Sequence, residues 1–139
     1  MRNHLIALVV GIGFIAGAHT IAAAQSATVR NEIEGQELFR TFCASCHGPD
    51  ARGNGPVASA LKRPPADLTT IAKRNGGVFP RERLIRYITN GDPSTTAHGS
   101  KEMPVWGPNL TALMPASNKP VSDHIANIAA YLESIQPRE

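Results

Sequence analysis

Cys43-Ala44-Ser45-Cys46-His47 is the stretch from which the rest of the chain is interpreted. Two thiols separated by two residues, with an imidazole directly after the second, form the attachment sequence for a c-type haem. If the stretch is helical, Cys43 and Cys46 project from one face, and both sulfurs can reach the two vinyl groups of one porphyrin. His47 then lies under the same ring system, where a neutral ring nitrogen can bind the iron. The motif therefore predicts one covalently attached haem c, held by Cys43 and Cys46 and ligated by His47.

Other uses of two nearby cysteines agree less well with this sequence. A structural zinc site usually takes four protein ligands, but the chain has 2 cysteines, and its other histidines form no second pair. A thioredoxin-like dithiol needs a preceding strand within a βαβ pattern, whereas the residues before Cys43 have a helical pattern. A disulfide between such near neighbours closes too small a loop to constrain the unfolded chain much.

Residues 1–24 have the three-part pattern of a secretory signal peptide. Arg2 supplies positive charge, residues 5–18 form an apolar run, and Ala22-Ala23-Ala24 offers small residues for cleavage. The apolar run is shorter than the roughly 20 residues that span a bilayer. We expect cleavage after Ala24, with Ala16-Gly17-Ala18 as a second possible site. The protein is then periplasmic, and the mature chain has no membrane span.

The length of the chain predicts one small domain, residues 25–139. A precursor of 139 residues is long enough for one core and too short for two ordinary domains. Its formal net charge of +3 falls by one when Arg2 is removed, so the charge does not indicate nucleic-acid binding.

The haem is expected to be part of the hydrophobic core, because only 5% of the residues are aromatic and so small a domain buries a limited fraction of its surface. The haem-free chain should then be poorly folded.

Apolar periodicity and turn residues predict several helices. We expect helices at residues 29–47, at about 67–74 capped by Asp67 or Thr69, at 80–90, and at 122–136 capped by Ser122, with a possible helical turn at 57–61. Gly35 in the first of these would let another helix approach closely. His124 falls in the polar first turn of the last helix, where we expect it at the surface. Residues 91–121 show no strong period, which predicts a long loop over the second face of the haem.

A hydrogen bond from the second ring nitrogen of His47, the one that does not bind iron, would fix the orientation of the ring. A proline carbonyl in the extended stretch after the motif can accept that bond and make the imidazole a stronger donor to iron. Pro65 is the first candidate and Pro56 the second.

The sixth iron ligand is open to several interpretations from the residues alone. Met103 has a soft thioether suited to haem iron, and the proline after it favours an extended strap. Met114 also precedes a proline and is a rival ligand. His98 can also reach the iron, and a sixth position without a protein ligand is the remaining alternative.

The chain resembles a class I monohaem bacterial cytochrome c over nearly all of residues 30–136. The resemblance rests on Gly35, Phe39, the Cys-x-x-Cys-His-Gly motif, Met103-Pro104-Val105-Trp106-Gly107 and the last helix. It implies an all-α cytochrome c-like domain of about 4–5 helices around one haem, with crossed N- and C-terminal helices that bring Tyr131 near Phe39 and Gly35. It also implies that Met103 is the distal ligand and that Trp106 donates to a haem propionate.

Iron ligated by His47 and Met103 has no vacant position, and the Met/His pair raises the reduction potential. We therefore expect one-electron transfer between redox proteins, with no catalysis by the chain itself. The expected partners are a dehydrogenase, a terminal oxidase or reductase, or other cytochromes, with basic residues either solvated or steering an acidic partner. The chain is then a monomeric carrier or a subunit of a dehydrogenase or oxidase complex. The alternative function is a haem enzyme or ligand sensor with an open or displaceable sixth position.

Overall fold

The structure is a computed structural model that describes residues 4–91 and 103–137, with side chains described from residue 23 onward within these ranges. The chain divides into two compact units, Met1–Arg30 and Asn31–Glu139. Helix α1, His4–Phe42, begins in the first unit and ends in the second. Over residues 23–91 and 103–137, no helix has the length and apolar character needed to cross a membrane.

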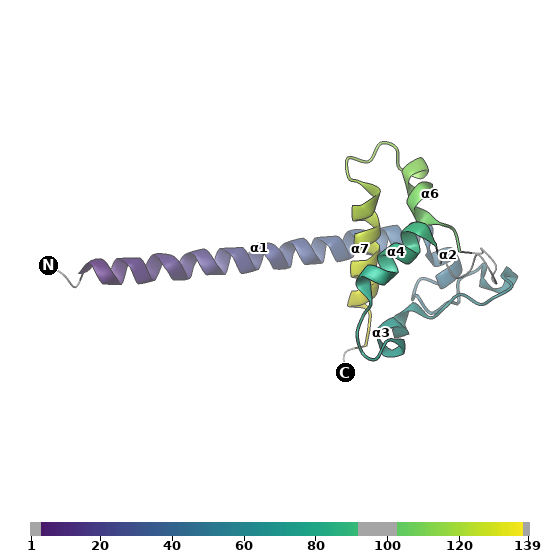
Figure 1. Cartoon of the computed structure of the whole chain (residues 1–139), viewed down its shortest axis with the longest axis horizontal. Helices are drawn as coiled ribbons and strands as arrows, with labels where there is room; N and C mark the ends of the chain where they lie inside the picture. Colours follow the sequence, from purple (N-terminus) through teal and green to yellow (C-terminus); the bar gives the residue numbers. More distant parts are fainter. Residues whose placement is uncertain (1–3, 92–102, 138–139) are drawn as a thin grey trace. The chain divides into compact units, whose positions relative to one another are not determined.

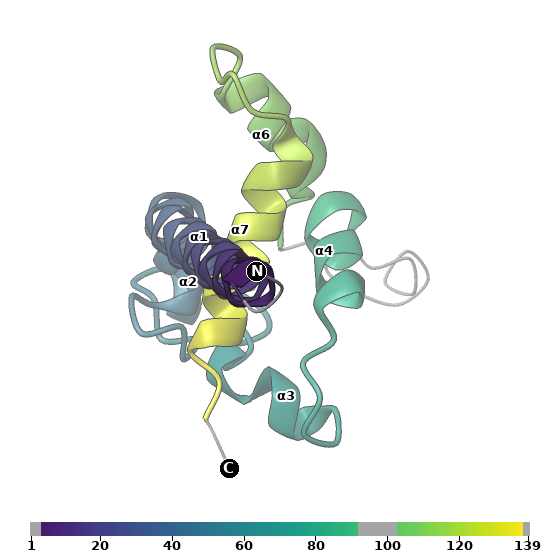
Figure 2. The same cartoon turned by 90° about the vertical axis from the view of Figure 1, so that its left-hand side faces the viewer.

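The second unit is all-helical in its described residues, as the sequence predicts (Figure 1). After the end of α1 the elements are α2 (Ala44–His47), η1 (Ala58–Ala60), η2 (Leu68–Thr70), α3 (Ile71–Arg74), α4 (Arg81–Asn90), α6 (Trp106–Leu113) and α7 (Val121–Ser134). Helix α4 packs against α6 and α7, and α6 also contacts α7. In both views α6 lies toward the beginning of α7 and α3 toward its end (Figure 1, Figure 2).

The first and last helices cross at Gly35, as the resemblance implies. A methyl group on Gly35 would lie 1.9 Å from the backbone oxygen of Asn127 and 3.0 Å from the Cβ of Tyr131. One turn further along α1, the fully buried ring of Phe39 meets the ring of Tyr131, with centroids 5.4 Å apart and planes at 49°. The absence of a side chain at Gly35 therefore sets how closely α1 and α7 approach.

The core of this unit lies between the end of α1, α4, α6 and α7. Its buried members are Leu38, Phe39, Ala51, Ile88, Leu110, Ile125, Ile128, Tyr131 and Leu132. Partly buried side chains from the cysteine motif and from the segment before α6 pack on the same cluster, among them Cys43 and Met103. One hydrophobic core thus joins the two parts of the chain that carry the predicted iron ligands.

Helix α6 was not predicted, because residues 91–121 lack a clear period. The helix contains both Gly107 and Pro108, which are poor helix formers in sequence, but a proline is tolerated in the first helical turn. A methyl group on Gly107 would lie 2.7 Å from the carbonyl oxygen of Thr89, so α6 begins in close contact with the end of α4. Residues 92–102 of the expected loop lie outside the described residues.

Helix α7 differs from the prediction in its cap and in one buried side chain. It begins at Val121 after Pro120, without a side-chain cap, so the predicted cap at Ser122 is wrong. The predicted surface position of His124 is also wrong, because the residue is only 4% exposed. His124 shares a helix face with Ile128 and Tyr131, at spacings of four and seven residues, and this face is covered.

The buried imidazole of His124 belongs to a polar group that joins three parts of the chain. Its Nε2 lies 2.8 Å from the hydroxyl of Ser117, and its Nδ1 lies 3.4 Å from a carboxylate oxygen of Glu34 on α1. The ammonium group of Lys119 pairs with the same carboxylate. The contact with Ser117 offsets part of the cost of burying this ring, whereas Nδ1 forms no hydrogen bond with the described residues.

The segment around α3 is fastened to the end of α7. The carboxylate of Asp67 accepts from the backbone N–H of Thr69 at 2.8 Å, which confirms Asp67 as a cap. The side-chain oxygen of Gln136 accepts from the N–H of Ala72 at 2.9 Å, and its amide nitrogen donates to the carbonyl oxygens of Leu68 at 2.9 Å and Leu132 at 2.6 Å. These bonds satisfy backbone groups at a helix start and a helix end.

Candidate functional site

The cysteine motif forms one turn of helix directly after α1. The N–H groups of Cys46 and His47 both donate to the carbonyl oxygen of Cys43, at 3.1 and 2.9 Å. Residue 43 interrupts the expected continuous helix with φ of −116° and ψ of −32°. The two sulfurs therefore leave neighbouring points of one turn, and both are free, half-buried thiols.

The electrostatic environment of the thiols differs from that of a redox-active dithiol. Burial, and to a lesser degree the nearby Cys46, raise the pKa of the Cys43 thiol to about 12. Reactive dithiols have the opposite arrangement, with pKa values lowered by positive charge or a helix N-terminus. Cys43 is therefore a neutral thiol in an apolar environment.

A loop segment, residues 53–57, holds the motif from outside through backbone hydrogen bonds. Alternate N–H groups of this segment donate to successive carbonyls of the motif, which have no partner within so short a helix. The pairs are Gly53 to His47 at 2.7 Å, Gly55 to Cys46 at 3.1 Å, and Val57 to Ser45 at 3.1 Å. A methyl group on Gly55 would lie 2.3 Å from the carbonyl oxygen of Ser45, so the segment runs directly against the backbone of α2.

The ring of His47 is oriented by a backbone carbonyl. Its Nδ1 lies 3.1 Å from the carbonyl oxygen of Ala66, and because a carbonyl only accepts, Nδ1 carries the proton. Nε2 is then left with a lone pair that can bind a metal. The prediction that Pro65 or Pro56 supplies this carbonyl is wrong. The prolines correctly mark the extended stretch, but the carbonyl directed at the ring belongs to the residue after Pro65.

The same surroundings keep the imidazole of His47 neutral. Burial holds its pKa below the ordinary value, and the hydrogen bond to Ala66 opposes this effect in part. Neutral imidazole is the form that binds metals. The site therefore presents a ring in the required protonation state, with its second nitrogen already engaged.

The segment that carries Met103 leads into α6, whose first residue lies against the end of α1. The rings of Trp106 and Phe42 pack with centroids 5.6 Å apart and planes at 56°, and Phe42 directly precedes Cys43. Met114 caps the opposite end of α6, about 12 Å away at 1.5 Å per residue. His98, the third candidate, lies outside the described residues.

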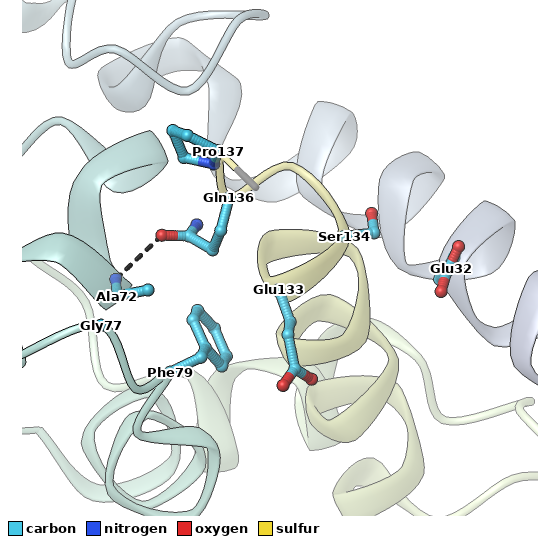
Figure 3. A pocket seen from close by; sticks show the side chains of 8 residues that line it. All are labelled: Glu32, Ala72, Gly77, Phe79, Glu133, Ser134, Gln136 and Pro137. Atoms are coloured by element: carbon cyan, nitrogen blue, oxygen red, sulfur yellow. Dashed lines mark hydrogen bonds between the residues drawn. The ribbon is translucent and has the colours of Figure 1, made fainter. Parts of the chain in front are cut away.

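The described residues offer no rival cluster of metal-binding side chains. Over residues 23–91 and 103–137, no three His, Cys, Asp or Glu side chains gather as a metal site requires. A surface pocket of about 380 Å³ lies between the α3 segment and the end of α7, bordered by Phe79, Glu133 and Gln136 (Figure 3). None of the motif residues lines it. Two free thiols on one turn and an imidazole with a free Nε2 form a donor set that suits haem c better than zinc.

Residues 30–113 match the model of the family described as cytochrome c oxidase, cbb3-type, subunit III. The chain belongs to this family. It is also similar to cbb3-type cytochrome c oxidase subunit FixP of Azorhizobium caulinodans, with 32% identity over 78 residues. That alignment covers 56% of this chain and 22% of FixP, so the chain spans about a fifth of the length of this relative. No solved structure matches the chain.

Membership of the cbb3-type subunit III family confirms the resemblance to monohaem c-type cytochromes. The domain carries covalently bound haem c and serves electron transfer.

The carbonyl of Ala66 and the two glycines of the 53–57 segment were not predicted from the sequence. All three act through the backbone, and only the density of turn residues between Gly48 and Pro56 indicates that this region is specialised.

Proposed function

We propose that this chain transfers single electrons outside the cytoplasm, through a haem c attached to Cys43 and Cys46 and ligated by His47 and Met103. The observation that carries the proposal is the motif turn itself, in which two free thiols precede an imidazole whose Nδ1 is bonded to a backbone carbonyl. When bound, haem c supplies an iron that changes its valence by one electron.

In this proposal, backbone contacts hold the iron ligand His47 in place, and a methionine is the second ligand. The Ala66 carbonyl holds the ring of His47, and the 53–57 segment holds the backbone of the motif. Met103 and Met114 both pack against the core cluster that Cys43 shares. Met103 is proposed as the ligand because it lies just before Trp106, at the end of α6 that packs against Phe42 beside the motif, whereas Met114 lies at the opposite end of α6. With His47 and Met103 as its ligands, the haem iron would have no open position, and its chemistry would be limited to electron transfer. Trp106 is proposed to contact a haem propionate.

The proposed partners are redox proteins, with a terminal oxidase first among them. FixP is a cbb3-type oxidase subunit by name, so we propose that this domain delivers electrons to an oxidase of that kind, either as a subunit or as a free monomeric carrier.

Residues 1–24 are proposed to be a signal peptide cleaved after Ala24. The mass of the intact protein from an exporting host tests cleavage, and affinity purification of the tagged chain with oxidase subunits tests the partner.

Attachment is tested by producing the protein in a host that matures c-type cytochromes. The wild type should retain haem after denaturation, with mass increased by one haem, whereas Cys43→Ala together with Cys46→Ala should lose the covalent haem. Carbon monoxide should bind poorly to the reduced wild type, because the sixth position is filled. A colourless wild type with two free thiols would contradict the proposal, and rapid carbon monoxide binding would favour the open-site alternative.

A further inference from the structure

Gly53 contacts both parts of the chain that hold His47. Its N–H donates to the carbonyl oxygen of His47 at 2.7 Å. On its other side it packs against the peptide between Pro65 and Ala66, where a methyl group on Gly53 would lie 2.2 Å from the Pro65 oxygen and 3.3 Å from the Ala66 oxygen. Its φ of +79° is a conformation that residues with a side chain rarely adopt.

The carbonyl that orients the imidazole lies one residue beyond the Pro65 carbonyl that Gly53 contacts. The carbonyl oxygen of Ala66 accepts from Nδ1 of His47 at 3.1 Å. The backbone just beyond it is tied down by the N–H of Leu68, which donates to the carbonyl oxygen of Ala51 at 2.8 Å. A group inserted at Gly53 would push on the Pro65 carbonyl. Because Leu68 is held by Ala51, the displacement would fall on the residues between them, which include the Ala66 carbonyl facing His47.

We infer that Gly53 is a positioning residue for electron transfer. Its missing side chain lets the Pro65–Ala66 peptide come close enough for the Ala66 carbonyl to fix the ring of His47. The inference rests on the proposed ligation of iron by His47. A hydrogen bond to the outer nitrogen makes a metal-bound imidazole a stronger donor, which favours the oxidised protein. Moving the Ala66 carbonyl away should weaken that donor and raise the reduction potential.

The chain provides a matched control for the conformational effect of the substitution. Gly76 also has a positive φ, +68°, but a methyl group there would have nothing within 4 Å. Gly53→Ala and Gly76→Ala thus share the penalty for a side chain in left-handed backbone. Only Gly53→Ala adds a collision with the Pro65 carbonyl, which directly precedes the residue whose carbonyl holds His47.

The test compares the haem-loaded wild type with Gly53→Ala and Gly76→Ala in two measurements. The first is the midpoint reduction potential, and the second is hydrogen exchange of the His47 Nδ1 proton, followed by NMR in the reduced protein. Gly53→Ala should shift the equilibrium between oxidised and reduced protein toward the reduced form by on the order of tenfold, a size taken from the lower end of the change in metal affinity when such a partner is lost. It should also speed exchange of the ring proton. Gly76→Ala should match the wild type in both. Equal values for all three proteins would overturn the inference.

The outcome separates this inference from the proposed function. If the wild type shows no haem-shifted His47 ring signals in the NMR spectrum, the ligation by His47 is wrong. If those signals are present and Gly53→Ala leaves the potential and the exchange unchanged, only the role of Gly53 is wrong. Should Gly53→Ala fail to fold, Pro65→Gly loosens the same peptide without a collision, and it should raise the potential and speed the exchange in the same direction. A wild-type potential in that variant would contradict the inference.

Discussion

Glu34 makes the stability of this fold depend on pH in acid. The hydrogen bond from Lys119 is the main reason that the pKa of its carboxyl lies below the ordinary value of 4.5, with burial opposing it and the charges of Lys119 and His124 adding to it. Because the pKa is lower in the folded chain, the unfolded chain binds more protons in acid. The stability contributed by this carboxylate is therefore complete above pH 4.5 and lost as the pH falls through the lower folded value.

Replacing the partner of Glu34 should flatten this acid dependence. In Lys119→Gln the pKa of Glu34 returns toward 4.5, so the free energy of unfolding should fall by less than about 1 kcal/mol near neutral pH and change less between pH 5 and 3. Chemical denaturation at several pH values measures both effects. Lys73→Gln, a change of an exposed lysine on α3, is the control. Identical pH profiles for Lys119→Gln and the wild type would contradict this role.

At the residue scale, chemistry carried by side chains could be predicted from the sequence, and chemistry carried by the backbone could not. Cys43, Cys46 and His47 were recognisable because covalent attachment needs those groups at that spacing. The carbonyl of Ala66 was not, because any residue can supply one. His124 was misplaced because a polar residue at a helix start is more often exposed, and its partly exposed partner Glu34 lies far away in sequence.

At the scale of elements, the α1–α7 crossing predicts a large effect for a small substitution. Gly35→Ala should favour an isolated helix by about 1 kcal/mol, yet its methyl group would collide with the backbone of Asn127 at 1.9 Å. Because neither backbone can give way easily, we expect a net loss of about 1–3 kcal/mol. Thermal denaturation of the haem-loaded protein measures this. Glu37→Ala, at an exposed position of the same helix, should change stability by no more than about 0.5 kcal/mol.

The junction between the α3 segment and α7 depends on one side chain. Gln136→Ala removes three hydrogen bonds to backbone groups, and we expect a loss of about 1–3 kcal/mol with faster amide exchange at Ala72. Gln36→Ala on α1 is the control of the same residue type. Unchanged exchange at Ala72 in Gln136→Ala would show that the α3 segment is held by other contacts.

Elements with a regular apolar stripe were predictable, and the element without one was not. Helices α4 and α7 appear close to the predicted residues because their apolar positions repeat at helical spacing. Helix α6 is held by tertiary contact, through Gly107 against Thr89 and Trp106 against Phe42. Its own composition favours a loop, so packing outweighs propensity there.

At the scale of the whole molecule, the haem should be needed for a stable fold. The buried core is small, with Phe39 and Tyr131 as its aromatic members among the described residues, and the motif residues at its edge are half-buried. Protein lacking haem, made by replacing both Cys43 and Cys46 with alanine in a host without cytochrome maturation, should show no cooperative thermal transition by near-ultraviolet circular dichroism. A cooperative, native-like transition in that protein would contradict the expectation.

The central claim is that one haem is ligated by His47 and Met103, which leaves the protein only electron transfer. The most direct measurement is the near-infrared absorption of the oxidised protein, where a weak band reports methionine bound to ferric iron. The band should be present in the wild type and in Met114→Leu and absent in Met103→Leu. A band that survives in Met103→Leu, or a wild type without one, would contradict the account.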